Sequence, residues 1–192
     1  MSNATHVQSR PDDADVLAEL PGELMMWVLI ASELLVFGAG LLACLAVRIG
    51  DPARFAADQA LLNQGAGALN TLVLVTSGLF AAIALRMREC GHRRTARLWL
   101  LAAGSLGIVF LIVKGIEYAS KAAIGIGIES SPFFTFYFLI TGFHALHVVA
   151  GIVVLALVAW VDRVRNMEAA VMFWHLVDLV WVLLFPIIYV LG

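Results

Sequence analysis

The chain has 192 residues, of which 62% are hydrophobic and 14% are charged, and its formal net charge is −2. A soluble domain carries about 25% charged residues, so this composition indicates that lipid surrounds most of the chain. No basic stretch is interleaved with aromatic residues, which excludes nucleic acid from the expected partners.

The chain opens with a polar segment. Residues 1–22 contain four carboxylates, and Arg10 is their only Lys or Arg. We expect these residues to form a disordered tail, and residues 23–192 to form one transmembrane domain.

Five apolar stretches follow, each long enough to cross about 30 Å of hydrocarbon as a helix. They cover residues 24–48, 68–86, 98–119, 133–161 and 169–191. Backbone groups in lipid must pair within their own segment, so each stretch is expected to be helical. The four connections carry most of the charges and the breakers Asp51-Pro52, Gly91, Gly125 and Ser131-Pro132. The sequence therefore predicts an all-α integral membrane bundle of five transmembrane helices.

The distribution of Lys and Arg predicts the orientation. Eight flank the spans on the side of the N-terminal tail and the second and fourth connections, against three on the other side. The positive side of a bacterial membrane protein faces the cytoplasm, so we expect a cytoplasmic N-terminus and a periplasmic C-terminus. An aromatic belt of Trp27, Trp99, Trp160 and Trp174 is then expected at the cytoplasmic boundary.

Ionisable residues inside the spans are the candidate functional residues. Each costs on the order of 2.5–3.5 kcal/mol to insert at a helix centre, so each needs a structural or functional reason. They are Glu33, Lys114, Glu117, His144, His147, His175 and Asp178.

These residues fall into two predicted layers. At a rise of 1.5 Å per residue, Glu33 and Asp178 lie roughly 13 Å from the cytoplasmic starts of their spans. His144, His147 and His175 are expected in this same inner layer. An outer layer is expected to contain Lys114 and Glu117, joined by Asn70. Spacings of three residues allow Asp178 to pair with an imidazole and Lys114 to pair with Glu117.

Three interpretations of these residues stay open from their spacing alone. They can be interhelical hydrogen bonds that hold the bundle together. A buried carboxylate such as Glu33 can exchange protons with the cytoplasm. Histidines on the fourth and fifth spans can ligate a haem b between them.

Several segments, read in order, resemble subunit III of cytochrome c oxidase. The most specific are TGFHALHV at residues 141–148 and WHLVDLVW at residues 174–181. Shorter matching segments lie at residues 32–37, 69–74, 77–78 and 117–118. The resemblance extends from about residue 22 to the C-terminus.

The resemblance implies a non-catalytic membrane partner of the catalytic subunit of a haem–copper oxidase. Such a subunit has no redox centre, metal or haem of its own, holds structural phospholipid and supports proton uptake from the cytoplasm. Glu33 stands where the family has a membrane-buried carboxylate. Other positions match polar residues of the family pattern, namely Asn70, Glu117, His144, His147, His175 and Asp178.

The chain also departs from the long form of the family, which has seven spans. Five-span members include short subunits of bacterial oxidases and accessory proteins encoded with nitric oxide reductase. Lys114 before Glu117-Tyr118 and the ending Leu184-Phe185-Pro186 resemble the accessory branch more closely. From the motifs taken together, we expect an oxidase subunit in a bacterial cell membrane. An accessory protein of nitric oxide reductase is the alternative, and an independent membrane haem-b protein or carrier is a third hypothesis.

Overall fold

The computed structural model describes residues 24–161 and 164–191, which are almost entirely helical and contain no strand. In chain order the elements are α2 (Leu24–Gly50), α3 (Pro52–Ala60), α4 (Gln64–Glu89), α5 (Arg93–Ala123), α6 (Pro132–Val161), α7 (Val164–Phe185) and the π-helical turn η1 (Pro186–Val190). Within the described ranges, five helices are long and apolar enough to cross a membrane. The predicted fold class is confirmed, whereas the expected tail, residues 1–22, lies outside the described residues.

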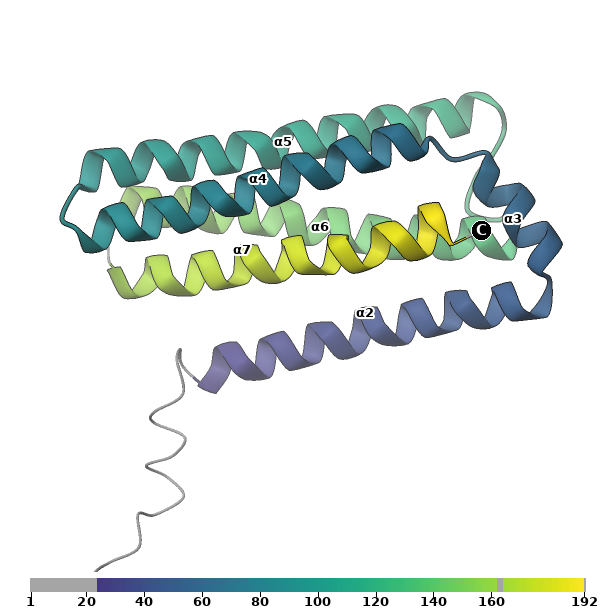
Figure 1. Ribbon diagram of the computed structural model, residues 1–192, viewed down its shortest axis with the longest axis horizontal. Helices are drawn as coiled ribbons and strands as arrows, with labels where there is room; N and C mark the ends of the chain where they lie inside the picture. The colour runs from purple at the N-terminus through teal and green to yellow at the C-terminus, as the bar shows by residue number, and fades with distance from the viewer. Residues whose placement is uncertain (1–23, 162–163, 192) are drawn as a thin grey trace, which may run out of the picture.

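The spanning helices form a four-helix bundle with one added helix. α4 packs against α5 and α7, and α6 packs against α5 and α7 from the opposite side. α2 lies along α6 and α7 at the edge of the bundle, and α3 crosses between α2 and α4 at one end (Figure 1). The face made by α4 and α7 is therefore opposite the face made by α5 and α6.

Local sequence signals end the helices where polar residues interrupt the apolar pattern. Asn63 caps α4 by accepting a hydrogen bond from the backbone N–H of Ala66 (3.0 Å). Gly91 and Gly125 follow the C-termini of α4 and α5 with φ of 84° and 75°, a left-handed conformation that glycine adopts without strain. The next N–H after each glycine reaches back to a carbonyl five residues earlier, which closes a Schellman motif.

The first connection, predicted as a loop, contains the short helix α3. Asp51 caps it by accepting from the N–H of Arg54 (3.1 Å), and Pro52 occupies the first helical position. Asp followed by Pro is a helix-start signal as well as a breaker, which is why a reading based on breakers missed this helix. α3 matters for the bundle because Gln59 donates to the carbonyl of Ile188 in η1 (2.9 Å).

Trp174 was expected in an interfacial belt, and the structure places it in the core instead. Its ring is fully buried, and its Nε1–H donates to the hydroxyl of Ser77 (3.0 Å). The ring fills space left by Gly107 on α5 and Gly151 on α6, where a Cβ would lie 2.7 Å and 2.5 Å from it. Trp27 and Trp160 are exposed, as residues of a belt would be.

Candidate functional site

The first pair of predicted site residues meets between α2 and α6. His147 Nε2 lies 3.1 Å from Glu33 Oε2, within ion-pair distance, and the two side chains are 17% and 20% exposed. Nδ1 of His147 lies 2.9 Å from the carbonyl of Phe143, which suits a proton on Nδ1. Oε2 of Glu33 is itself buried and accepts no hydrogen bond from the described residues, so the contact is a close approach of the two groups and not a formed hydrogen bond.

His144 lies one helical turn from His147 but makes different contacts. It is fully buried, and neither ring nitrogen has a hydrogen-bond partner among the described residues. The imidazole stacks on Trp181 (ring centroids 5.2 Å apart, interplanar angle 30°) and meets Phe110 edge-on at 5.5 Å. Within the described chain His144 therefore packs as an aromatic ring and forms no interhelical hydrogen bond.

Asp178 and His175 lie on the other side of α7, against α4. Asp178 is buried, and neither carboxylate oxygen has a hydrogen-bond partner among the described residues, so the expected pairing with an imidazole is not formed. A Cβ at Gly78 of α4 would collide with Oδ2 of Asp178 and lie 3.3 Å from Nδ1 of His175. Both side chains thus pack over this glycine without pairing with each other, and His175 is exposed.

The predicted inner layer is therefore two groups separated by α7. Glu33, His144 and His147 border one small gap beside Leu176, Val177 and Val180 of α7. His175 and Asp178 face α4 from the same stretch of α7. A haem held between two histidines needs both imidazoles to face one common space. His144 and His175 do not share such a space.

The expected Lys114–Glu117 pair is formed and is enclosed by aromatic residues. Lys114 Nζ lies 3.0 Å from Glu117 Oε2, and the residues are only 2% and 5% exposed. Nζ also donates to the hydroxyls of Tyr189 (2.8 Å) and Tyr137 (3.1 Å). Tyr189 in turn donates to the Glu117 carboxylate. Four aromatic rings surround the ammonium group with centroids 4.8 Å to 5.5 Å away, which adds cation–π attraction.

Asn70 does not join this pair as expected. Its Nδ2 donates to the carbonyl of Phe110 (3.3 Å), and Oδ1 has no partner among the described residues. The sequence reading missed Tyr137 and Tyr189, which complete the Lys114 site. Tyr137 lies seven residues before His144 on the same helix face, so helical spacing could have indicated it, whereas Tyr189 reaches the site through the π turn after Pro186.

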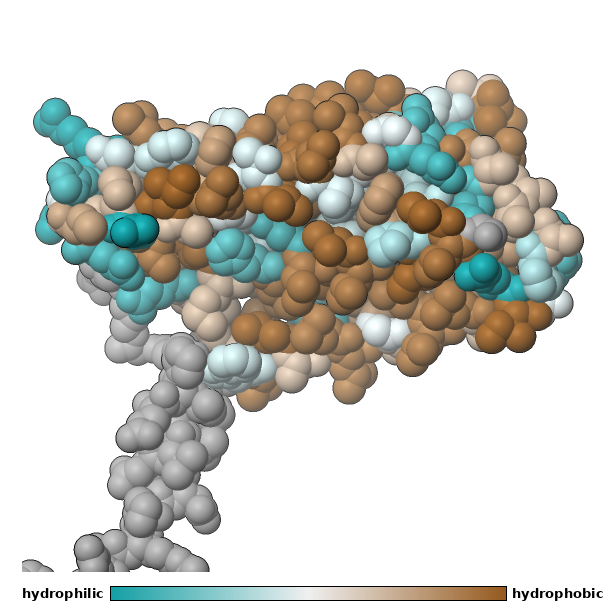
Figure 2. Space-filling model, in the orientation of Figure 1, coloured by the Kyte–Doolittle hydropathy of each residue, from teal (hydrophilic) through white to brown (hydrophobic). Residues whose placement is uncertain are grey.

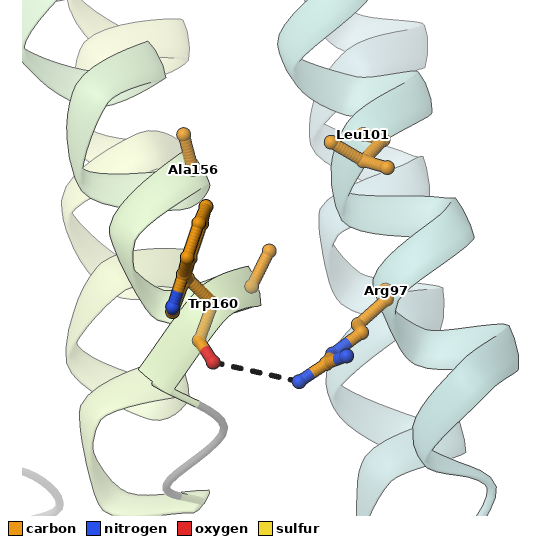
Figure 3. A pocket seen from close by; sticks show the side chains of 5 residues that line it. Arg97, Leu101, Ala156 and Trp160 are labelled. Atoms are coloured by element: carbon orange, nitrogen blue, oxygen red, sulfur yellow. Dashed lines mark hydrogen bonds between the residues drawn. The ribbon is translucent and has the colours of Figure 1, made fainter.

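A separate hollow lies between α5 and α6 at the arginine-rich end of the bundle. It has a volume of about 370 Å³ and is lined by Arg97, Leu101, Ala156, Ala159 and Trp160. Figure 3 shows Arg97 at one side, where it donates to the carbonyl of Trp160 (3.4 Å). Trp160 is 84% exposed. The lining of the hollow therefore combines one cationic side chain, Arg97, with apolar side chains.

Comparison with known proteins places this geometry in a family. The model of the family described as "Cytochrome c oxidase subunit III" matches residues 59–192. The chain belongs to the cytochrome c oxidase subunit III family. Both specific motifs, at residues 141–148 and 174–181, lie within the matched region, whereas Glu33 on α2 precedes it.

Relatives in the subunit III family cover most of the chain. Cytochrome c oxidase subunit 3 of Thermostichus vulcanus is 28% identical over 88% of this chain and 86% of its own length. Cytochrome bo(3) ubiquinol oxidase subunit 3 of Pseudomonas putida is 27% identical over 88% of this chain and 85% of its own length. Heme-copper oxidase subunit I+III of Aeropyrum pernix is 28% identical over 85% of this chain, which spans 22% of that longer protein. The chain spans about half, 47% to 48%, of the fungal relatives that it matches.

Proposed function

We propose that the chain is a non-catalytic subunit of a respiratory haem–copper oxidase, bound laterally in the membrane to the catalytic subunit. The observation that carries this proposal is the match to the Aeropyrum pernix protein, whose name joins subunits I and III in one chain. A fused chain keeps its two parts together, so a separate subunit III is expected to bind a separate subunit I.

Co-purification from native membranes tests this function. An affinity-tagged chain, solubilised in mild detergent, should retain a haem–copper oxidase catalytic subunit, identified by mass spectrometry and by the haem absorption of the sample. An untagged strain is the control. Retention of a nitric oxide reductase in place of the oxidase would overturn the proposal and support the accessory alternative. Haem absorption from the chain alone would also overturn it and would support a haem-b protein.

The proposal extends to proton uptake at Glu33. His147 Nε2 lies 3.1 Å from Glu33 Oε2 and both side chains are partly exposed, so a small reorientation of either group would let a proton pass between them and reach the surface of the bundle. Glu33 lies in the half of α2 nearer the arginine-rich end, the end that the sequence assigns to the cytoplasm. In this proposal the N-terminal residues 1–22 lie on that side of a bacterial membrane.

We further propose that the hollow at Arg97 and Trp160 holds an anionic phospholipid. The guanidinium group suits the headgroup phosphate, and the floor of Ala156 and Ala159 suits an acyl chain (Figure 3). Replacing Arg97 with Gln should reduce phosphatidylglycerol retained after purification about fivefold, since one arginine near an anionic lipid contributes about 1 kcal/mol. Arg94→Gln, an exposed arginine that does not line the hollow, is the matched control. Equal losses in both variants would contradict the site.

A further inference from the structure

His175 occupies an unusual position for an ionisable residue in a membrane helix. Among the described residues, it is the only ionisable side chain that is exposed and more than five residues from both ends of a candidate span. It makes no hydrogen bond, ion pair or ring contact with the described part of the chain. Ionisable groups within spans almost always face a protein interior or a polar cavity, because an imidazole in contact with acyl tails loses its hydration.

The neighbouring carboxylate of Asp178 does not pair with this imidazole. It packs over Gly78, as His175 does, and neither of its oxygens is paired within the described residues. Neither ring nitrogen of His175 is paired within the described residues, so a neutral imidazole keeps one nitrogen that can accept a hydrogen bond from a group outside the chain.

The surroundings of His175 suit another transmembrane helix. Exposed apolar side chains flank the polar spot on both helices, with Val75 and Leu79 on α4 and Leu179 and Val182 on α7. Figure 2 shows this side of the molecule, where a few hydrophilic side chains interrupt the apolar surface between α4 and α7. Gly78 is buried beneath Asp178 and His175, so the exposed surface at this spot is formed by His175 and its apolar neighbours.

We propose that the α4/α7 face is the docking surface for a transmembrane helix of the catalytic subunit, which donates a hydrogen bond to His175. The inference rests on the proposed function and adds where the partner binds. A hydroxyl, amide or indole N–H from the partner satisfies the outward nitrogen, and apolar side chains around it exclude lipid. A bilayer has no such donor at this depth, so the proposal commits to protein as the occupant.

Site-specific photo-crosslinking in native membranes tests the docking surface. A benzoylphenylalanine at Leu179, which is 48% exposed one turn from His175, is compared with the same group at Ile108 on the opposite face, which is 49% exposed. We expect adducts with the catalytic subunit from position 179 and not from position 108. Adducts with lipid alone from position 179 would overturn the docking surface, as would protein adducts confined to position 108.

Substitution of the imidazole separates docking from folding. His175→Leu should reduce the catalytic subunit retained by the tagged chain about threefold to tenfold, the effect of one interhelical hydrogen bond in a membrane. His175→Asn should restore part of this retention, and the thermal unfolding of the isolated chain should not change. Ser105→Ala is the control, because this exposed hydroxyl donates within its own helix (2.8 Å). Unchanged retention in His175→Leu would contradict the proposal.

Failure of the docking surface and failure of the proposed function give different results. If the unmodified chain retains the catalytic subunit but position 179 does not crosslink to it, only the docking surface is wrong. If the unmodified chain retains no catalytic subunit, the proposed function is wrong, and the catalytic subunit is then also wrong as the partner of this surface.

Discussion

At the scale of single residues, a substitution at the Glu33–His147 contact distinguishes a role in proton uptake from a role in packing. Glu33→Gln keeps the shape of the side chain and removes the group that holds the proton. We expect the variant to retain the catalytic subunit fully but to complete fewer turnovers before the oxidase inactivates, because proton uptake slows. Oxygen consumption followed to inactivation measures this, with Glu168→Gln, an exposed carboxylate at the start of α7, as the matched control. An unaltered number of turnovers would leave Glu33 with a packing role only.

Lys114 is a residue whose loss should be felt in stability. Lys114→Met leaves Glu117 buried without its cation, which is expected to cost about 3–5 kcal/mol of unfolding free energy. The double variant Lys114→Met/Glu117→Gln removes both charges and should recover much of that loss. Thermal unfolding in detergent compares the two. A double variant no more stable than the single one would show that hydrogen bonds from Lys114 to the tyrosines matter more than charge pairing.

At the scale of helices, the packing of Trp174 depends on glycines of two neighbours. Gly151→Ala places a Cβ about 2.5 Å from the ring, so we expect a loss of about 1–3 kcal/mol through overpacking. Gly115→Ala on α5 makes the same chemical change where nothing lies within 4 Å, and should leave stability unchanged or raise it by up to about 1 kcal/mol. Unfolding temperatures in one detergent decide the outcome, and equal effects would mean that α6 shifts to make room.

Sequence patterns predict which segments are helices better than they predict the contacts between helices. Apolar length predicts each span because lipid forces helical pairing of the backbone, and residues three apart, such as Lys114 and Glu117, predict a pair within one helix. Contacts between helices depend on rotation about each helix axis, which composition does not determine. For this reason Asp178 was expected to pair with an imidazole and instead faces Gly78, and Trp174 was expected at the surface and instead fills the core.

At the scale of the whole molecule, the two cysteines provide a test of orientation. Both are free, Cys90 being exposed in the turn between α4 and α5 and Cys44 buried in α2. A membrane-impermeant maleimide should label the chain in inside-out vesicles and not in intact cells. Cys90→Ser should abolish that labelling. Adding Ala57→Cys, at an exposed position of α3, to Cys90→Ser should restore labelling, now in intact cells. The reverse pattern would place Glu33 nearer the periplasm and contradict uptake from the cytoplasm.

The Lys114–Glu117 pair also bears on how the chain enters the membrane during synthesis. The two residues lie three positions apart on α5, so opposite charges emerge from the ribosome together and can neutralise each other before any later helix exists. Tyr137 is made 23 residues after Lys114 and Tyr189 75 residues after it. Insertion of α5 therefore need not wait for the rest of the chain, and the phenols add their hydrogen bonds afterwards, as the last turn folds back.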